Sequence, residues 1–240
     1  MREENYQIVY EDNHLIAVNK PAGWLVQGDE TGDKPLSEYI KEYIKHRYQK
    51  PGDVYLGVIH RIDRPVSGLV IFARTSKALE RMNKLFEKRE IKKRYLAVVE
   101  NRPEELEGRL SHFISKDHEK NIVSISNSPK NKSYKSAELQ YKYLGGIGHH
   151  HLLEVLPSTG RPHQIRAQLS KIGCSIRGDV KYSAQKGNED GRIHLHSYSL
   201  EFIHPVKLEA ITIKARLPDE QVWNLFKGSL GEIDYYKKHI

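Results

Sequence analysis

The 240-residue sequence contains a single cysteine, Cys174, so it has no intramolecular disulfide framework. It shows no internal repeat and no low-complexity segment. Its first twenty residues, MREENYQIVYEDNHLIAVNK, lack the long apolar stretch of a signal peptide or a membrane span. We therefore expect a protein of the reducing cytoplasm that does not associate with membranes.

Acidic residues are outnumbered by basic ones. Lys and Arg total 39 against 31 Asp and Glu, which gives a formal net charge of +8 and a pI near 9.3. Such an excess favours a polyanionic partner over an acidic metabolite. Basic clusters occur at 45–50, 88–94 and 130–135, and this spread is typical of a broad phosphate-binding surface. For any single cluster, a solvated face is the simpler interpretation.

Helical periodicity is limited to three windows. The first runs from Leu36 to Tyr48, the second begins at Ser76 as N-cap, and the third begins near Pro162 and stops at Gly173. Cys174 follows that last helix and is expected to be a small buried residue. With 38% hydrophobic residues, the chain can bury a core.

Alternating apolar patterns outnumber helical ones and predict an α+β fold with mostly antiparallel strands. Residues 7–20 read as a hairpin around Glu11-Asp12-Asn13. Further strands are expected at 54–59, 68–73, 92–99, 109–115, 134–144, 151–156, 194–203 and 208–215, and loops at 27–35, 116–133 and 183–192. We expect one domain over residues 1–240, which can be divided into two sub-lobes.

The first segment that suggests chemistry is GVIHRIDRPVSGLVIFA, residues 57–73. Asp63 stands between Arg61 and Arg64, and Pro65 and Gly68 then enforce a tight return into the next strand. Nearby positive charge keeps a carboxylate ionised, which suits a nucleophile or a base. An ordinary ion-paired turn is the alternative interpretation.

The second segment is LPSTGRPHQIRAQLSKIGCSIRGDVKYS, residues 156–183. Its turn leads into a helix, and the free N–H groups at a helix start favour an anion. Arg166 lies beside the apolar stripe of this helix, where it can point inward and form a bidentate pair with a buried carboxylate. Asp63 is the candidate partner, and a surface arginine is the alternative.

Three ordered blocks of the chain resemble RluA-type pseudouridine synthases. They are VYEDNHLIAVNKPAGWLV; then HRIDRPVSGLVIFART with KKRYLAVV; then PSTGRPHQIRAQLSKIGCSIRGDVKYS with RIHLHSYSLEFIHP. Together they cover most of the sequence, and we expect no separate N-terminal RNA-binding module, which some relatives carry, before the first block. Val66 and Pro162 stand where the family usually has threonine, beside the positions that match catalytic residues.

The resemblance implies an α+β fold, with a long, bent, mixed but mostly antiparallel sheet, flanking helices and a central cleft that binds RNA. The target uridine would be flipped into a pocket. Asp63 would then attack the sugar or remove a proton from it, so that the glycosidic bond breaks and the uracil rejoins through carbon. Arg166 matches the residue that orients this aspartate, and Tyr95 matches a tyrosine that stacks on the uracil. Without the resemblance, Tyr95 would read as a core aromatic.

The same resemblance assigns RNA-binding or base-binding roles to Arg61, which can fill the gap left by the flipped base, and to His60, Arg161, His163 and Leu217. Leu217 would form an apolar wall of the pocket. It implies no metal and no organic cofactor, and ribosomal or transfer RNA as the partner. We expect a monomer.

Two other functions remain open. A non-catalytic RNA-binding or ribosome-assembly protein would show the same basic surface. A metal-dependent RNA hydrolase would use Asp63 with histidines such as His149–His151, His194 and His196, but no close set of Asp, Glu and His ligands appears in the sequence. Adjacent histidines in a strand point to opposite faces, so a solvated loop end is the simpler interpretation for the first group. His196 falls in an apolar strand and reads as structural.

Overall fold

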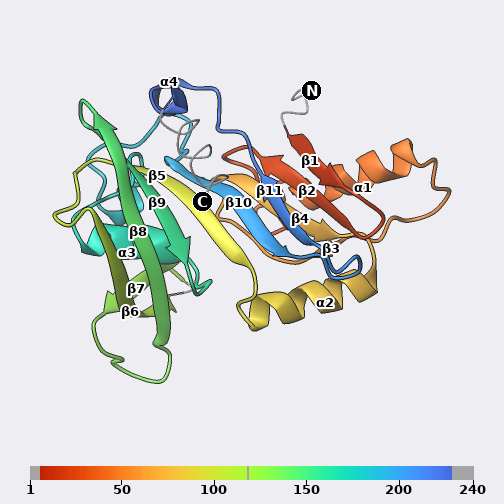
Figure 1. Cartoon of the computed structure of the whole chain (residues 1–240), viewed down its shortest axis with the longest axis horizontal. Coiled ribbons are helices and arrows are strands. Elements are labelled where there is room, and N and C mark those ends of the chain that lie inside the picture. Colours follow the sequence, from red (N-terminus) through yellow and green to blue (C-terminus); the bar gives the residue numbers. More distant parts are fainter. Residues whose placement is uncertain (1–5, 118, 229–240) are drawn as a thin grey trace. The chain divides into compact units, whose positions relative to one another are not determined.

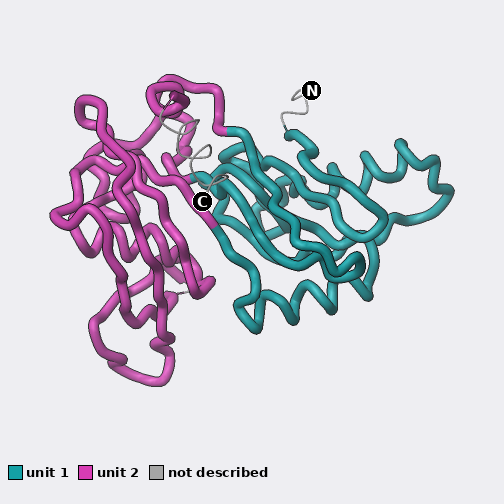
Figure 2. Tube along the Cα trace, viewed as in Figure 1, with its two compact units in different colours: residues 1–93, 196–216 teal, residues 94–195, 217–240 magenta. Residues whose placement is uncertain are grey.

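The structure is a computed structural model that describes residues 6–117 and 119–228. The chain forms two compact units, residues 1–93 with 196–216 and residues 94–195 with 217–240 (Figure 2). In both units most strand pairs are antiparallel and helices flank the strands (Figure 1). The predicted α+β class with a mixed, mostly antiparallel sheet is therefore confirmed.

The first unit begins with the predicted hairpin, β1 (Gln7–Glu11) and β2 (Leu15–Lys20). Asp12 closes the turn because its Oδ1 accepts hydrogen bonds from the backbone N–H groups of His14 and Leu15, both at 2.8 Å. The strand order continues with β4 (Ser67–Ala73), antiparallel to β2, then β10 (Leu195–Ile203), parallel to β4, and β11 (Ala210–Lys214), antiparallel to β10. The strand expected at 54–59 is only β3 (Gly57–Val58), paired with the end of β4.

Two helices belong to this unit, α1 (Leu36–Arg47) and α2 (Ser76–Glu87), and both lie where the periodicity predicts them. The N-cap of α2 is Thr75 rather than Ser76, because the Thr75 hydroxyl accepts the Ala78 N–H at 3.1 Å. Helix α2 packs beside β4 (Figure 1), and its Ala78 and Met82 are completely buried in a hydrophobic core of the unit. That core also includes Leu15, Ala17, Leu69, Ile71, Ala73, Ile91, Leu200, Phe202, Ile213 and Ala215.

The second unit contains antiparallel strands in the order β5 (Lys92–Val99), β9 (His150–Pro157), β8 (Lys135–Ile147), β6 (Glu107–Asp117) and β7 (Ile122–Ser126). The loop expected at 116–133 is wrong over β7, which pairs with the end of β6. The short alternation IVSIS lies between charged residues, which hid it. Val123 is buried against Ala137, Ala167 and Tyr182.

Helix α3 (Gln164–Lys171) begins two residues after the predicted start at Pro162, and His163 precedes it with a left-handed φ of 50°. The Gln168 amide fixes α3 on the strands by donating to the carbonyls of Leu110 at 3.2 Å and Ala137 at 3.1 Å. Cys174 is buried after this helix, as expected. A 3₁₀ turn, η1 (Val180–Tyr182), and a short helix, α4 (Gln221–Asn224), complete the unit.

Candidate active site

Asp63 lies in the connection from β3 to β4 and is partly exposed. Its carbonyl accepts the Val66 N–H at 3.0 Å, which closes a tight turn. Gly68 follows with φ +112°, and a Cβ there would lie 2.3 Å from the backbone oxygen of Ser197 on β10. Only glycine allows this approach, so β4 starts at a fixed position and Asp63 is held a few residues before it.

Lys20, the last residue of β2, lies beneath this turn and is completely buried. Its ammonium donates three hydrogen bonds, to the carbonyls of Pro21 at 3.0 Å, Trp24 at 2.9 Å and Arg64 at 3.2 Å. Burial lowers the pKa of Lys20 to about 7, and the negative charge of Asp63 opposes this shift. Three donated bonds require the protonated amine, so the site is built around a buried cation that faces Asp63.

The two arginines beside Asp63 behave differently from the sequence-based expectation. The Arg64 guanidinium pairs with Asp33, with Nη2 and Oδ2 2.6 Å apart, and its Nε donates to the Gly23 carbonyl at 3.0 Å. Arg61 is exposed and forms no hydrogen bond or ion pair with the rest of the described chain. Within this unit, Lys20 is thus the buried cation facing Asp63, a role that the sequence assigns to the flanking arginines.

Two histidines support this part of the unit as neutral groups. His196 is completely buried, its Nδ1 lies 2.9 Å from the Ser67 hydroxyl, and burial lowers its pKa to about 3. His60 accepts the Ile71 N–H at Nε2, at 3.1 Å, and its ring stacks on Phe86 with a centroid distance of 5.1 Å. Burial lowers the His60 pKa to about 4. These contacts make His60 part of the scaffold, and a role in binding RNA stays a prediction.

In the second unit, Arg166 forms a buried bidentate pair with Asp179. The distances are 2.7 Å from Nε to Oδ2 and 2.8 Å from Nη2 to Oδ1. The Tyr182 ring lies 4.9 Å from the guanidinium carbon. The sequence predicts an inward-pointing arginine with a carboxylate partner, and the partner within this unit is Asp179, thirteen residues later in the GDVKYS segment, which the sequence does not single out. The pairing of Arg166 with Asp63 stays a prediction.

The turn before α3 is held by side chains. Arg161 is exposed, and its Nε donates to the Ser136 carbonyl at 3.0 Å. The Tyr182 hydroxyl accepts the Val123 N–H at 3.0 Å and lies 2.7 Å from His163 Nδ1. When the Tyr182 hydroxyl donates to His163 Nδ1, the Val123 N–H, the hydroxyl and the ring nitrogen each have a hydrogen-bond partner. The neutral imidazole then carries its proton on Nε2.

Tyr95 lies on β5 opposite Val155 of β9 and is partly exposed. The preceding residue, Arg94, is buried in an ion pair with Glu154. Because side chains alternate along a strand, Tyr95 and Arg94 point to opposite faces. Leu217, which follows β11, is partly exposed. Asp63 belongs to the first unit and Tyr95 and Arg166 to the second, so their convergence stays a prediction.

Within residues 6–117 and 119–228, no three His, Cys, Asp or Glu side chains come together as metal ligands would. None of the described helices combines the length and the apolar character that a membrane crossing requires.

The segments that carry Asp63, Tyr95 and Arg166 fall within one match to a protein family. The family model for RNA pseudouridylate synthases matches residues 14–171. The chain belongs to this family. The resemblance to RluA-type pseudouridine synthases is thereby confirmed, and so is the assignment as an RNA-modifying isomerase.

Curated family members resemble this synthase over nearly its whole length. The tRNA pseudouridine synthase C of Haemophilus influenzae is 31% identical, over 94% of this chain and 98% of that protein. The protein of the same name from Pectobacterium carotovorum is 31% identical over 95% of this chain, which spans 64% of its length. The ribosomal large subunit pseudouridine synthase C of Buchnera aphidicola is 31% identical, over 88% of this chain and 67% of its own.

A solved structure confirms the fold of the synthase. The human protein called RNA pseudouridylate synthase domain containing 4 has a TM-score of 0.74 and 24% identity, and the match covers 93% of this chain and 91% of that one. At this identity the likeness concerns the fold alone.

Proposed function

We propose that this RNA pseudouridine synthase modifies transfer RNA and that Asp63 is its catalytic carboxylate. The observation that carries the proposal is the rigid Asp63 turn, set by the Gly68 approach to β10 and underlain by the buried ammonium of Lys20. A fixed cation near a carboxylate favours its ionised form, which both candidate mechanisms need.

The reaction is an isomerisation, so its atoms balance without a co-reactant. Asp63 either attacks C1′ of the flipped uridine or removes a proton from the sugar. The bond from C1′ to N1 then breaks, and its electron pair leaves with the uracil. The ring turns and C5 bonds to C1′; in the first route this breaks the bond from C1′ to Asp63, and in the second Asp63 returns the proton to the sugar. The proton on C5 is then lost, and N1 gains a proton. We place Tyr95 against the uracil ring, near that proton.

Arg166 is proposed as the positioning residue for Asp63. A guanidinium has five N–H donors, so the bidentate pair with Asp179 does not exhaust its capacity. That pair fixes the guanidinium plane in advance, which lowers the entropy lost when the carboxylate is gripped. Arg61, His60, Arg161, His163 and Leu217 are proposed as contacts to the RNA or its flipped base, as the resemblance implies.

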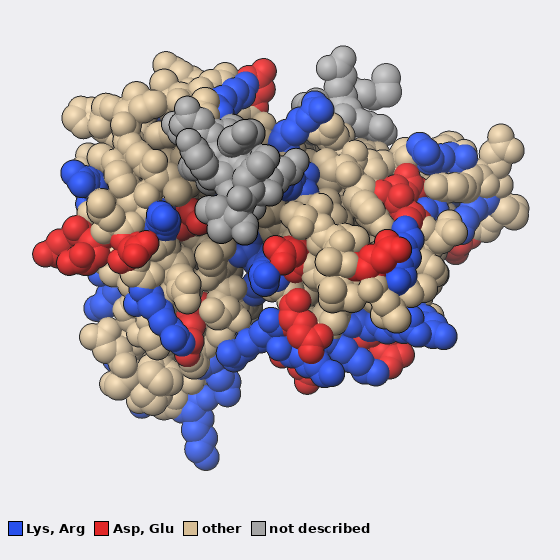
Figure 3. Space-filling model, viewed as in Figure 1, with Lys and Arg blue, Asp and Glu red and all other residues tan. Residues whose placement is uncertain are grey.

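Transfer RNA is favoured as the substrate because several curated relatives are named tRNA pseudouridine synthase C. Ribosomal RNA is the second candidate because the Buchnera relative is named a ribosomal large subunit pseudouridine synthase. Exposed basic residues suit either polyanion. In Figure 3, Lys and Arg side chains gather over α2, which carries Lys77, Lys84 and, just beyond it, Lys88 and Arg89. Such side chains bind phosphates without reading sequence.

The test is tritium release from uridine labelled at C5, measured separately on transfer and ribosomal RNA without added metal. We expect release from transfer RNA, none above background with Asp63→Asn, and normal release with the exposed control Asp53→Asn. Release from ribosomal RNA alone would overturn the choice of substrate. Full activity of Asp63→Asn would contradict the catalytic assignment, and binding without release would favour a non-catalytic RNA-binding protein. Abolition by a chelator would favour a metal-dependent hydrolase.

We also infer a cytoplasmic monomer. Light scattering during size exclusion should give the mass of one chain, 27.8 kDa. A stable mass of two chains would contradict this inference.

A further inference from the structure

A hollow on the first unit lies next to the Asp63 turn. It holds about 220 Å³, less than the roughly 300–1,000 Å³ of most small-molecule pockets, so it suits one flat group rather than a whole metabolite. Its lining residues are Gly23, Trp24, Leu25, Asp33, Lys34, Tyr39 and Arg64. None of these residues is given a role in the proposed reaction.

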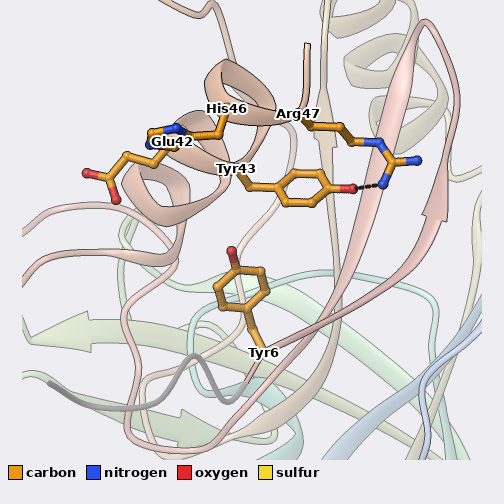
Figure 4. Close-up of a pocket in the computed structure, with 5 residues that line it drawn as sticks. All are labelled: Tyr6, Glu42, Tyr43, His46 and Arg47. Atoms are coloured by element: carbon orange, nitrogen blue, oxygen red, sulfur yellow. Dashed lines mark hydrogen bonds between the residues drawn. The ribbon is translucent and has the colours of Figure 1, made fainter. Parts of the chain in front are cut away.

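Aromatic rings form the walls of this hollow. The Trp24 and Tyr39 rings lie 4.7 Å apart between centroids, tilted by 40°, and Tyr6 approaches Trp24 edge-on at 6.2 Å. Tyr6 also faces a neighbouring recess, where it lies across from Tyr43, whose hydroxyl contacts Arg47 (Figure 4). The half-buried rings of Trp24 and Tyr39 therefore provide stacking surface at the edge of α1.

Two cations line this hollow, and each of them pairs with an exposed carboxylate. The Lys34 ammonium lies 4.2 Å from the Tyr39 ring centre and 2.6 Å from Glu42. Arg64 pairs with Asp33 at 2.6 Å. All four side chains are more than 40% exposed, so water screens both ion pairs and a competing ligand breaks them at little cost, while the Arg64 Nε can keep its hydrogen bond to the Gly23 carbonyl. Lys34 thus occupies a ring face that a flat ligand can take over.

We propose that this hollow binds one unpaired nucleotide of the substrate RNA, next to the uridine that reacts. Its base replaces the Lys34 ammonium on Tyr39, beside Trp24, and the displaced Lys34 and Arg64 contact its phosphate. Aromatic rings with adjacent cations are the usual means of holding single-stranded nucleic acid. This inference rests on the proposed function, because it requires RNA at Asp63.

The hollow and the Asp63 turn are connected through adjacent residues and shared hydrogen bonds. Arg64 lines the hollow and is the residue after Asp63, one Cα spacing of about 3.8 Å away. The Arg64 carbonyl accepts the Gly23 N–H at 2.8 Å and the Lys20 ammonium at 3.2 Å. A nucleotide bound in the hollow is therefore close enough to Asp63 to be the neighbour, along the RNA strand, of the uridine that reacts.

The fluorescence of Trp24 reports directly whether a base occupies the hollow. The protein has two tryptophans, and Trp223 is 1% exposed, so quenching by a bound base acts on Trp24. The probes are a single-stranded oligouridylate and an abasic strand of the same length and charge, titrated into the full chain. We expect quenching by the oligouridylate and little by the abasic strand. Trp24→Phe should remove the signal, and equal quenching by both strands would overturn the proposal.

Variants separate stacking from general RNA affinity. Tyr39→Leu keeps an apolar side chain without the ring, and we expect it to weaken oligouridylate binding on the order of tenfold. Tyr55→Leu is the matched control, since Tyr55 is an exposed tyrosine of the same unit outside the hollow. Wild-type affinity in Tyr39→Leu, with circular dichroism unchanged, would refute the stacking role.

The result can fail independently of the proposed function. Asp63→Asn should quench as the wild type does while releasing no tritium. Tritium release without base-dependent quenching would leave the catalytic proposal standing and remove this one, whereas quenching by Asp63→Asn that also retains full activity would remove only the catalytic proposal.

Discussion

Replacing Lys20 by methionine tests the buried cation under Asp63. Methionine has a similar length but no charge and no donor, so the carbonyls of Pro21, Trp24 and Arg64 lose a shared partner. Lys20 is completely buried, which limits replacement of these bonds by water. Removing one member of a buried charged network typically costs about 3–5 kcal/mol, and we expect Lys20→Met to lose that much free energy of unfolding.

The effect of Lys20 on stability should depend on pH. Its pKa in the folded protein, about 7, is below the ordinary lysine value of 10.5, so the unfolded chain binds more protons between these values. The free energy of unfolding from this group therefore rises as pH increases from about 7 to 10.5. Lys20→Met lacks this rise, so the deficit of the variant should be larger at pH 9 than at pH 6.

Urea unfolding followed by circular dichroism measures both effects. The control is Lys50→Met, an exposed lysine for which we expect a change below about 0.5 kcal/mol. A loss under about 1 kcal/mol in Lys20→Met, or a deficit that is the same at both pH values, would refute the reasoning. Tritium release should also decline above about pH 7 in the wild type, as Lys20 loses the charge that faces Asp63.

Other predictions concern packing, charge and salt. Gly68→Ala should lower the free energy of unfolding by about 3 kcal/mol in urea, whereas Gly191→Ala, also at positive φ but with open space around it, should cost about 1 kcal/mol. Asp179→Ala leaves Arg166 buried without its bidentate partner and should cost about 3–5 kcal/mol, with Asp190→Ala as the exposed control. Burial raises the pKa of the Cys174 thiol to about 11, so a disulfide reagent at pH 8 should modify it only after unfolding; rapid labelling of native protein would contradict this. Raising salt from 50 to 200 mM should increase KM for RNA and leave kcat nearly unchanged, because exposed phosphate contacts weaken while buried charges do not.

Local features of the fold could be predicted because they depend on neighbours in the sequence. The Asp12 turn and the apolar face of α1 act within a few residues, and the predicted N-cap of α2 was wrong by one residue. The β7 strand was missed because its five residues lie inside a charged segment and become a strand only by pairing with β6. The strand is stabilised by tertiary contacts, and a single sequence does not show which segments make them.

The site shows the same division between near and distant partners. The Asp63 turn could be identified from Pro65 and Gly68, whose backbone constraints are local. The sequence analysis named Asp63 as the candidate partner of Arg166 and did not single out Asp179, although a buried arginine accepts either carboxylate. Only the folded unit shows that Asp179 takes two of the guanidinium donors.

Proximity in the sequence also misled the electrostatic argument for Asp63. Arg61 and Arg64 are its near neighbours along the chain, yet one is exposed and the other pairs with Asp33. Lys20, 43 positions away, is buried and faces it. Coulomb energy grows as the effective dielectric falls, and salt screens an exposed charge but scarcely a buried one. A buried ammonium therefore interacts more strongly with a nearby carboxylate than an exposed guanidinium at the same distance does, and salt weakens that interaction less.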